Sequence, residues 1–286
     1  MRIFETQIVT ASLEDLRALG KLDLDLKHRA ARQEGRNRFV VPGILNAEEI
    51  KKAKAAGYEV NIIDDLSEML DARKRGVSPV NRFLTARRIP DMATRSVEGY
   101  LTPEEVEEAL INLSNEYPDL VEIIELPNHT WEDRVSHAVR VGSSLNSDQT
   151  AVLFTGSMHA REWGGSDICV SFLINLIQAY ETNNILQYGG KVFSADQVRA
   201  IIDNLNIIVF PDVNADGKQY SQTVDPMWRK NRNPNIGIDP QNLGVDLNRN
   251  FDFLWPSGIG TSILPSSNIY KGEYPFSEPE VKNVLY

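Results

Sequence analysis

The chain has 286 residues, of which 42% are hydrophobic and 24% are charged; these values are typical of globular proteins and exclude a fibrous or disordered chain. Its formal net charge of −10 argues against a nucleic-acid partner, because such partners are usually met by a basic face. The single cysteine allows no internal disulfide, and the lack of a run of about 18 apolar residues argues against a membrane partner.

The first 76 residues are predicted to form a small α+β domain. Ser12 and Asn46 stand where helix N-caps are expected, and Gly20 and Gly57 stand where the two helices should end. The predicted elements are strands at residues 3–11, 22–26, 38–45 and 58–62, and helices at residues 13–19, 47–56 and 66–75. Their order predicts a ferredoxin-like β-α-β-β-α-β domain, a four-stranded antiparallel sheet with two helices on one face.

Residues 77–97 are predicted to connect two domains. They contain two prolines and several arginines, and no hydrophobic period continues across them. A run of charges is often only a solvated surface. The alternative is a basic, protease-sensitive link between folded domains.

A second domain is predicted from residue 98 to residue 286. Thr102-Pro103-Glu104-Glu105 combines an N-cap, a proline at the first helical position and a capping-box glutamate. The predicted elements that follow are helices at 103–116 and 166–182 and strands at 121–126, 135–141, 151–156 and 206–213. The last two strands are short, apolar and β-branched, as buried strands are. Strands that alternate with helices predict a mixed α/β sheet.

The clearest candidate for chemistry is Gly156-Ser157-Met158-His159-Ala160-Arg161-Glu162-Trp163, directly after a predicted strand. A histidine and a glutamate three residues apart can converge on one Zn²⁺ ion if the chain turns between them. An ordinary surface pair has the same spacing. The position at the carboxyl end of a strand favours a site, because open α/β sheets bind ligands there.

A second candidate lies between residues 211 and 253. It contains Trp228-Arg229-Lys230 and Gly244-Val245-Asp246-Leu247-Asn248-Arg249-Asn250-Phe251. An asparagine beside an arginine suits a carboxylate, which a guanidinium binds with two parallel hydrogen bonds. Each arginine alone is equally typical of an acidic protein's surface.

Together these segments resemble the zinc carboxypeptidase family related to the pancreatic carboxypeptidases A and B. The stretches around Tyr270-Lys271-Gly272 and Ser277-Glu278-Pro279-Glu280 continue the resemblance in the family's order. The first domain resembles the family's activation domain in Gly57-Tyr58-Glu59-Val60 and Asp64-Asp65-Leu66. The resemblance covers nearly the whole chain.

The resemblance implies a role for each matching residue. His159 and Glu162 would be two of three Zn²⁺ ligands, and Arg229 would stabilise the oxyanion of the tetrahedral intermediate. Asn248 and Arg249 would hold the substrate's C-terminal carboxylate.

Two further residues have implied roles around this centre. Arg161 would contact the peptide one subsite further out. Asp246 would lie behind the metal ligands, accept the His159 N–H and fix its tautomer.

The third ligand histidine of the family is expected on a strand beyond Tyr286, followed by a substrate-binding tyrosine and a general-base glutamate. The other histidines, His28, His129 and His137, belong to segments that precede the candidate motif. They are expected to be ordinary core or surface residues. The chain is therefore expected to be a C-terminally truncated piece of a longer precursor.

The resemblance implies a zinc metallocarboxypeptidase zymogen that releases a single C-terminal residue from peptides or proteins by attack of a metal-activated water. Its own N-terminal domain would inhibit it. An alternative is a non-catalytic module that binds C-terminal carboxylates without a complete zinc site, and a third possibility is deacylation of small amino acids. Family members with such a domain are mostly secreted, whereas the first residues lack the apolar segment of a secretory signal, so localisation stays open.

Overall fold

A computed structural model describes residues 2–27, 30–75, 99–144, 149–237 and 243–286. The predicted connector at 77–97 and His28 lie outside these residues. The chain divides into two compact units. Unit one comprises Met1–Lys74 and Arg229–Glu278, and unit two comprises Arg75–Trp228 and Pro279–Tyr286.

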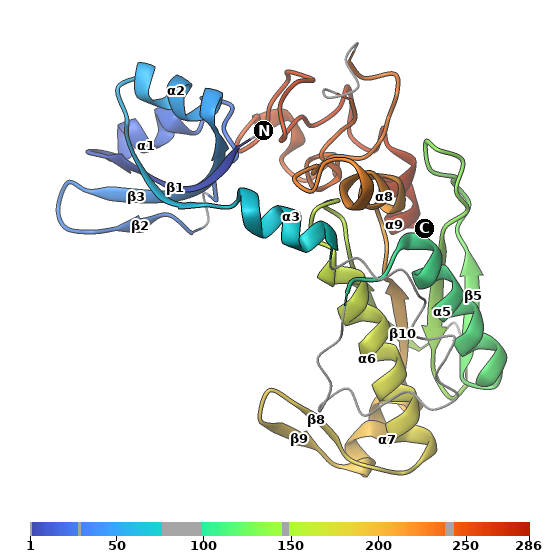
Figure 1. Ribbon diagram of the computed structural model, residues 1–286. Coiled ribbons are helices and arrows are strands. Elements are labelled where there is room, and N and C mark those ends of the chain that lie inside the picture. The colour runs from blue at the N-terminus through green and yellow to red at the C-terminus, as the bar shows by residue number, and fades with distance from the viewer. Residues whose placement is uncertain (1, 28–29, 76–98, 145–148, 238–242) are drawn as a thin grey trace. The chain divides into compact units, whose positions relative to one another are not determined.

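Unit one begins with a four-stranded sheet and short helices (Figure 1). In chain order the elements are β1 (Ile3–Thr10), α1 (Leu13–Leu19), β2 (Arg32–Gln33), β3 (Phe39–Asn46), α2 (Ala47–Ala55), β4 (Glu59–Asp65) and α3 (Ser67–Arg75). The strand order is β2-β3-β1-β4, and all neighbours are antiparallel. One face of this sheet packs with α1 and α2 in a buried cluster formed by Ile8, Leu19, Leu24, Val41, Leu45, Ile50, Ala53 and Val60.

Both predicted helix starts in this sheet domain are confirmed. The Ser12 side chain accepts a hydrogen bond from the backbone of Asp15 at the start of α1. Asn46 and Glu49 form a reciprocal capping box at the start of α2, so two N–H groups without helical partners are satisfied. Gly57, with φ 90°, follows α2 in the left-handed conformation that the sequence predicted.

The strand predicted at residues 22–26 is wrong. Within the described residues only Leu26 forms a bridge, to Gly43 of β3. The Leu26 N–H bonds to the carbonyl of Leu24 at 2.9 Å, so a local turn replaces the ladder that a strand needs. Leu22, Leu24 and Leu26 alternate with charged residues because their side chains pack into or against the core. The second strand forms instead at β2 (Arg32–Gln33).

The rest of unit one, Arg229–Glu278, is mostly loop with two short 3₁₀ helices, η2 (Leu247–Arg249) and η3 (Trp255–Ser257). Asn231 fixes its backbone: its side-chain oxygen accepts from the Val245 N–H at 2.8 Å, and its own N–H donates to the Val245 carbonyl at 3.0 Å. Gly244 has φ 82°, and a Cβ there would lie 2.1 Å from the Asn231 carbonyl oxygen. Only glycine fits at this position. The turn therefore sets the direction of the backbone from Val245 to Asp246.

Unit two is a mixed sheet with helices packed against it. Its strands are β5 (Val121–Glu125), β6 (His137–Val141), β7 (Thr150–Thr155) and β10 (Leu205–Phe210), in the order β5-β6-β10-β7. Its helices are α5 (Pro103–Glu116), α6 (Gly164–Glu181), α7 (Ala195–Asn204), α8 (Ala215–Thr223) and α9 (Pro279–Leu285), and a small hairpin consists of β8 (Leu186–Tyr188) and β9 (Lys191–Phe193). β10 is antiparallel to β6 and parallel to β7, so the predicted mixed α/β sheet is confirmed.

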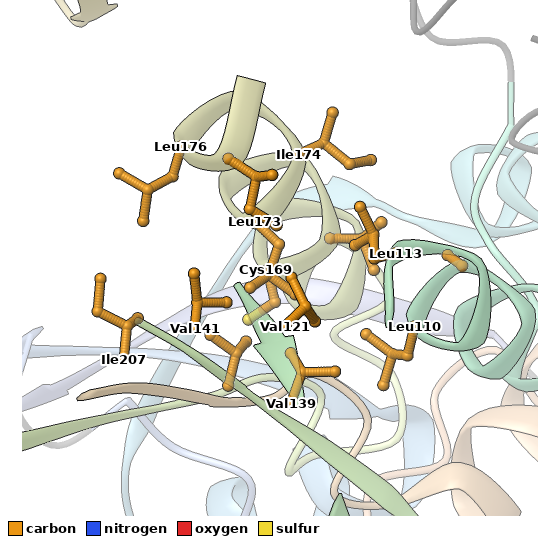
Figure 2. Close-up of a cluster of buried hydrophobic side chains, with 14 of the residues drawn as sticks. Leu110, Leu113, Val121, Val139, Val141, Cys169, Leu173, Ile174, Leu176 and Ile207 are labelled. Carbon is orange, nitrogen blue, oxygen red and sulfur yellow. The ribbon is translucent and has the colours of Figure 1, made fainter. Parts of the chain in front are cut away.

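The core of unit two joins the sheet to α5 and α6 (Figure 2). Val198 and Ile202 of α7 belong to the same core. Leucines of α5 and α6 meet valines and isoleucines at alternate positions of β5, β6 and β10, which therefore share one face of the sheet. Thr102 and Glu105 form the predicted capping box at the start of α5. Cys169 lies in this core, and burial raises the pKa of its thiol to about 11.

β7 differs from the prediction of a buried strand. All six of its residues are exposed, with Leu153 at 46% and Phe154 at 43% of their full exposure. The reason is its place in the sheet, because β7 is an edge strand that pairs only with β10 among the described residues. Phe154 reaches Phe172 of α6, with ring centroids 5.1 Å apart.

None of the described helices is both long enough and apolar enough to span a bilayer.

Candidate active site

The loop after β7 is fixed to the neighbouring strand before any candidate ligand is reached. The Gly156 N–H donates to the Phe210 carbonyl at 3.0 Å, and the Gly156 carbonyl accepts from the Val213 N–H at 3.1 Å. A Cβ at Gly156 would lie 2.4 Å from the Pro211 carbonyl oxygen and 2.8 Å from that of Gly165. The glycine is thus required by the close approach of three backbone segments, and it places the next residues at the carboxyl end of the parallel pair β7–β10.

His159 and Glu162 lie side by side in this loop. The His159 Nδ1 and the Glu162 Oε1 are 2.9 Å apart. The His159 side chain is 12% exposed and the Glu162 side chain 59% exposed. The imidazole is therefore largely buried, whereas the carboxylate faces solvent. The Glu162 N–H also donates to the His159 carbonyl at 2.9 Å, which is the turn that brings the two side chains together. Arg161 lies half-buried between them in the sequence.

The donor types of this pair fit Zn²⁺, which binds imidazole nitrogen and carboxylate oxygen. Within the described residues, no three His, Cys, Asp or Glu side chains are grouped so that they could hold a metal ion. His129 and His137 have carboxylate partners of their own, Asp133 at 2.8 Å and Glu107 at 2.6 Å. In this turn the described residues bring one imidazole and one carboxylate together, those of His159 and Glu162.

Arg229 and Asp246 form a buried ion pair in unit one. The Arg229 Nε and Nη2 both approach Asp246 Oδ2, at 3.0 and 2.9 Å. Asp246 is completely buried, and Arg229 is nearly so. The paired carboxylate compensates the cost of burying a guanidinium and holds it in one orientation. The predicted contact of Asp246 with His159 stays a prediction, whereas the contact with Arg229 was not anticipated from the sequence.

Asp246 also begins the short helix that carries the predicted carboxylate clamp. Its Oδ1 accepts from the Asn248 N–H at 3.1 Å and so caps η2. Asn248 is exposed and Arg249 half-buried. The Arg249 Nε donates to the Gly260 carbonyl at 2.8 Å and one terminal nitrogen donates to the Asn248 carbonyl at 3.0 Å. The Asp246 carboxylate thus pairs with Arg229 and caps the short helix that carries Asn248 and Arg249.

Two lysines are buried, Lys230 beside Arg229 in unit one and Lys218 in unit two. Burial lowers the pKa of Lys230 to about 8, against the attraction of Asp246, and its Nζ donates to the Pro265 carbonyl at 2.6 Å. Lys218 of α8 is fully buried and pairs with Asp212 at 3.2 Å. Burial raises the pKa of Asp212, and Lys218 opposes that shift. Lys230 belongs to the candidate segment Trp228-Arg229-Lys230, whereas no sequence motif marks Lys218.

Comparison with known proteins places these residues in a family. The family model described as zinc carboxypeptidase matches residues 106–286. Mast cell carboxypeptidase A of Mus musculus is 34% identical over 168 residues, which are 59% of this chain and 36% of that protein. Metallocarboxypeptidase A of Trichophyton tonsurans is 36% identical over 152 residues, which are 53% of this chain and 32% of that protein.

Solved structures agree at the level of the fold. The carboxypeptidase A from Helicoverpa armigera superposes with a TM-score of 0.72 at 22% identity, over 99% of this chain and 65% of that one. Thrombin activatable fibrinolysis inhibitor superposes with a TM-score of 0.66 at 22% identity, over 100% of this chain and 68% of that one.

The mixed α/β fold and the matched segment define a metallocarboxypeptidase-like protein. The chain belongs to the zinc carboxypeptidase family. It spans about a third of the length of the curated relatives that it matches.

Proposed function

We propose that this chain supplies the first part of a zinc carboxypeptidase site, with His159 and Glu162 as two of the metal ligands. The observation that carries the proposal is their 2.9 Å approach in a rigidly held turn at the end of β7. The family match spans this turn. Zinc bound there would lower the pKa of a water molecule and so provide the nucleophile for peptide hydrolysis.

The chain's own residues would then bind and polarise the substrate. Asn248 and Arg249 would take the free C-terminal carboxylate, which a guanidinium binds with two parallel hydrogen bonds. Arg229 would stabilise negative charge on the scissile carbonyl oxygen, and its ion pair with Asp246 fixes the guanidinium beforehand. Arg161, in the same turn as the two ligands, would contact the peptide further from its end.

A complete catalytic zinc site needs a third protein ligand and a general base. We propose that neither comes from the residues described here, since these present only His159 and Glu162 as a donor set. The alternative is a module that keeps the carboxylate-binding residues without hydrolysis. Peptide C-termini are the expected partners of both the enzyme and the non-catalytic module. Only the enzyme requires zinc.

The N-terminal sheet domain is proposed to be the activation domain of a zymogen. Its strand order and its helix-covered face fit the ferredoxin-like domain predicted from the sequence. It would inhibit the enzyme until the basic connector is cut.

Binding of peptides with free and amidated C-termini tests the proposed clamp. We expect the free acid to bind measurably better than its amide, and Arg249→Ala to remove that preference while Arg36→Ala, at an exposed position of the same unit, keeps it. The loss should be about 2 to 5 kcal/mol if the pairing is well desolvated. Equal binding of acid and amide by the unsubstituted chain would contradict the clamp.

A further inference from the structure

The turn that carries His159 and Glu162 is attached to one face of α8. Three residues make the attachment: Asn214, the N-cap of α8, and Lys218 and Ser221 within it. Their spacings of four and three residues place them on the same side of the helix. We call these three residues the α8 face.

Lys218 is the most unusual member of the α8 face, because it is a lysine with no solvent exposure. Its Nζ donates to the Ser166 hydroxyl and pairs with Asp212 Oδ2 at 3.2 Å. Burying a charged amine is costly unless it is paired and hydrogen-bonded. A hydrophobic side chain would fill the same space without that cost, so the contacts of Lys218 must offset it.

The Lys218 contact continues directly into the turn. The Ser166 hydroxyl lies 2.9 Å from the Ser157 hydroxyl, and the Ser157 hydroxyl accepts from the Ser166 N–H at 3.1 Å. Ser157 has φ 49°, a left-handed conformation that is unfavourable for a residue other than glycine. Ser157 stands two residues before His159, so the hydrogen-bonded chain from Lys218 holds the backbone at its most strained point.

The other two members of the α8 face hold the turn at further points. The Asn214 side chain donates to the Met158 carbonyl at 3.3 Å. The Ser221 hydroxyl donates to the Ala160 carbonyl at 2.7 Å and accepts from the Trp163 indole N–H. The residues on both sides of His159 are therefore tied to α8, and the residue after Glu162 is tied as well.

We propose that Lys218, with its counter-ion Asp212, is a positioning residue that holds His159 and Glu162 in the geometry required for the metal. This inference rests on the proposed function of the two ligands, because positioning matters only if they bind zinc. Lys218 reaches them through Ser166 and Ser157.

Amide hydrogen exchange and zinc affinity of the full 286-residue chain test the proposal. Two variants are compared with the unsubstituted chain: the double variant Lys218→Met with Asp212→Asn, which removes both buried charges, and the milder Ser166→Ala, which removes only the connecting hydroxyl. Leu173→Ala is the matched control, because it opens the α6 core away from the turn. The metal probe is Zn²⁺ alone, measured by competition with a chromogenic chelator.

The expected result is faster exchange at residues 156–166 in both variants, by about tenfold relative to β6, with zinc affinity about tenfold lower, as for other residues that orient metal ligands. Leu173→Ala should speed exchange across α6 and the sheet and leave zinc affinity within about twofold. Unchanged exchange in the turn, or an unchanged affinity despite faster exchange, would overturn the positioning role.

The exchange measurement needs no metal, so it separates this inference from the proposed function. If the unsubstituted chain binds no zinc through His159, the proposed ligands are wrong and the inference falls with them. If zinc is bound through His159 and the Lys218 and Ser166 variants bind it equally well, only the inference is wrong. If the double variant does not fold, Ser166→Ala alone decides.

Discussion

Three histidine–carboxylate pairs occur in the described part of unit two, and two of them have nearly the same separation but different exposure. His159 and Glu162 are 2.9 Å apart, and His129 and Asp133 are 2.8 Å apart. The His129 side chain is 52% exposed, whereas that of His159 is 12% exposed. A paired histidine in a loop is therefore not by itself a metal site. His159 differs from His129 because it stands in a fixed turn at the end of a strand.

The burial of Lys230 predicts how the free energy of unfolding depends on pH. Burial lowers its pKa from 10.5 to about 8 in the folded protein. Below pH 8 the folded state bears the cost of a buried charge. Between about pH 8 and 10 the folded state has lost the proton while the unfolded state keeps it, so unfolding becomes less favourable as the pH rises. The contribution over this range is about 2 kcal/mol.

The measurement for Lys230 is urea unfolding at several pH values. The stability of the unsubstituted chain relative to Lys230→Met should rise by this amount between pH 8 and 10, and Lys51→Met, at an exposed lysine of the same unit, should show no such change. The Cys169 thiol acts in the opposite direction between about pH 9 and 11, because burial raises its pKa, but it is common to all three proteins. A flat difference for Lys230→Met would contradict the assigned cost of burial.

At the scale of elements, patterns that act locally were read correctly from the sequence. The caps at Ser12, Asn46 and Thr102 were predicted because each needs only a side chain and the next three residues. The strand prediction at residues 22–26 is wrong because alternation of apolar residues shows which side chains are buried. It does not show whether the backbone has a partner strand. The His159–Glu162 contact was also accessible, since three residues in a turn decide it.

Features that depend on distant parts of the chain could not be read in this way. The exposure of β7 follows from its place at the sheet edge, and an apolar sequence does not show which strand lies outermost. The same holds for the pairing of Arg229 with Asp246, which lie 17 residues apart in the sequence. Their approach depends on the turn at Gly244.

The edge strand β7 predicts how the chain behaves in solution. An exposed, uncharged, apolar edge is a template for pairing with another chain. We expect concentration-dependent association of the 286-residue chain, and we expect Leu153→Lys to reduce it, because a charge on an edge strand opposes further pairing. Sedimentation velocity at several concentrations measures this, with Ile185→Lys, exposed outside the sheet, as the control. Equal association of both variants would exclude β7 as the cause.

At the scale of the whole molecule, the N-terminal sheet domain has the features of an independently folding part. Its buried cluster consists of residues between Ile8 and Val60, and Phe4 packs against it. We therefore expect residues 1–76 to unfold cooperatively when produced separately. Circular dichroism during thermal unfolding checks this, and a non-cooperative transition would argue against an autonomous activation domain.

Limited digestion of the complete chain addresses the predicted connector. Trypsin is expected to cut first within residues 77–97, which contain Arg82, Arg87, Arg88 and Arg95, and to leave two resistant pieces. Mass spectrometry of the first products identifies the site. First cuts elsewhere would contradict the division of the chain at this segment.

The central claim is that His159 and Glu162 are zinc ligands, and calorimetric titration of the 286-residue chain with Zn²⁺ tests it most directly. Two donors bind zinc more weakly than a complete site, so we predict weak binding, no release of C-terminal residues from peptides, and a loss of at least about tenfold in affinity for His159→Ala and for Glu162→Gln. The exposed pair offers the matched control, and His129→Ala with Asp133→Asn should bind zinc as the unsubstituted chain does. Binding that survives His159→Ala, or tight stoichiometric zinc with peptide hydrolysis by these residues alone, would contradict the account.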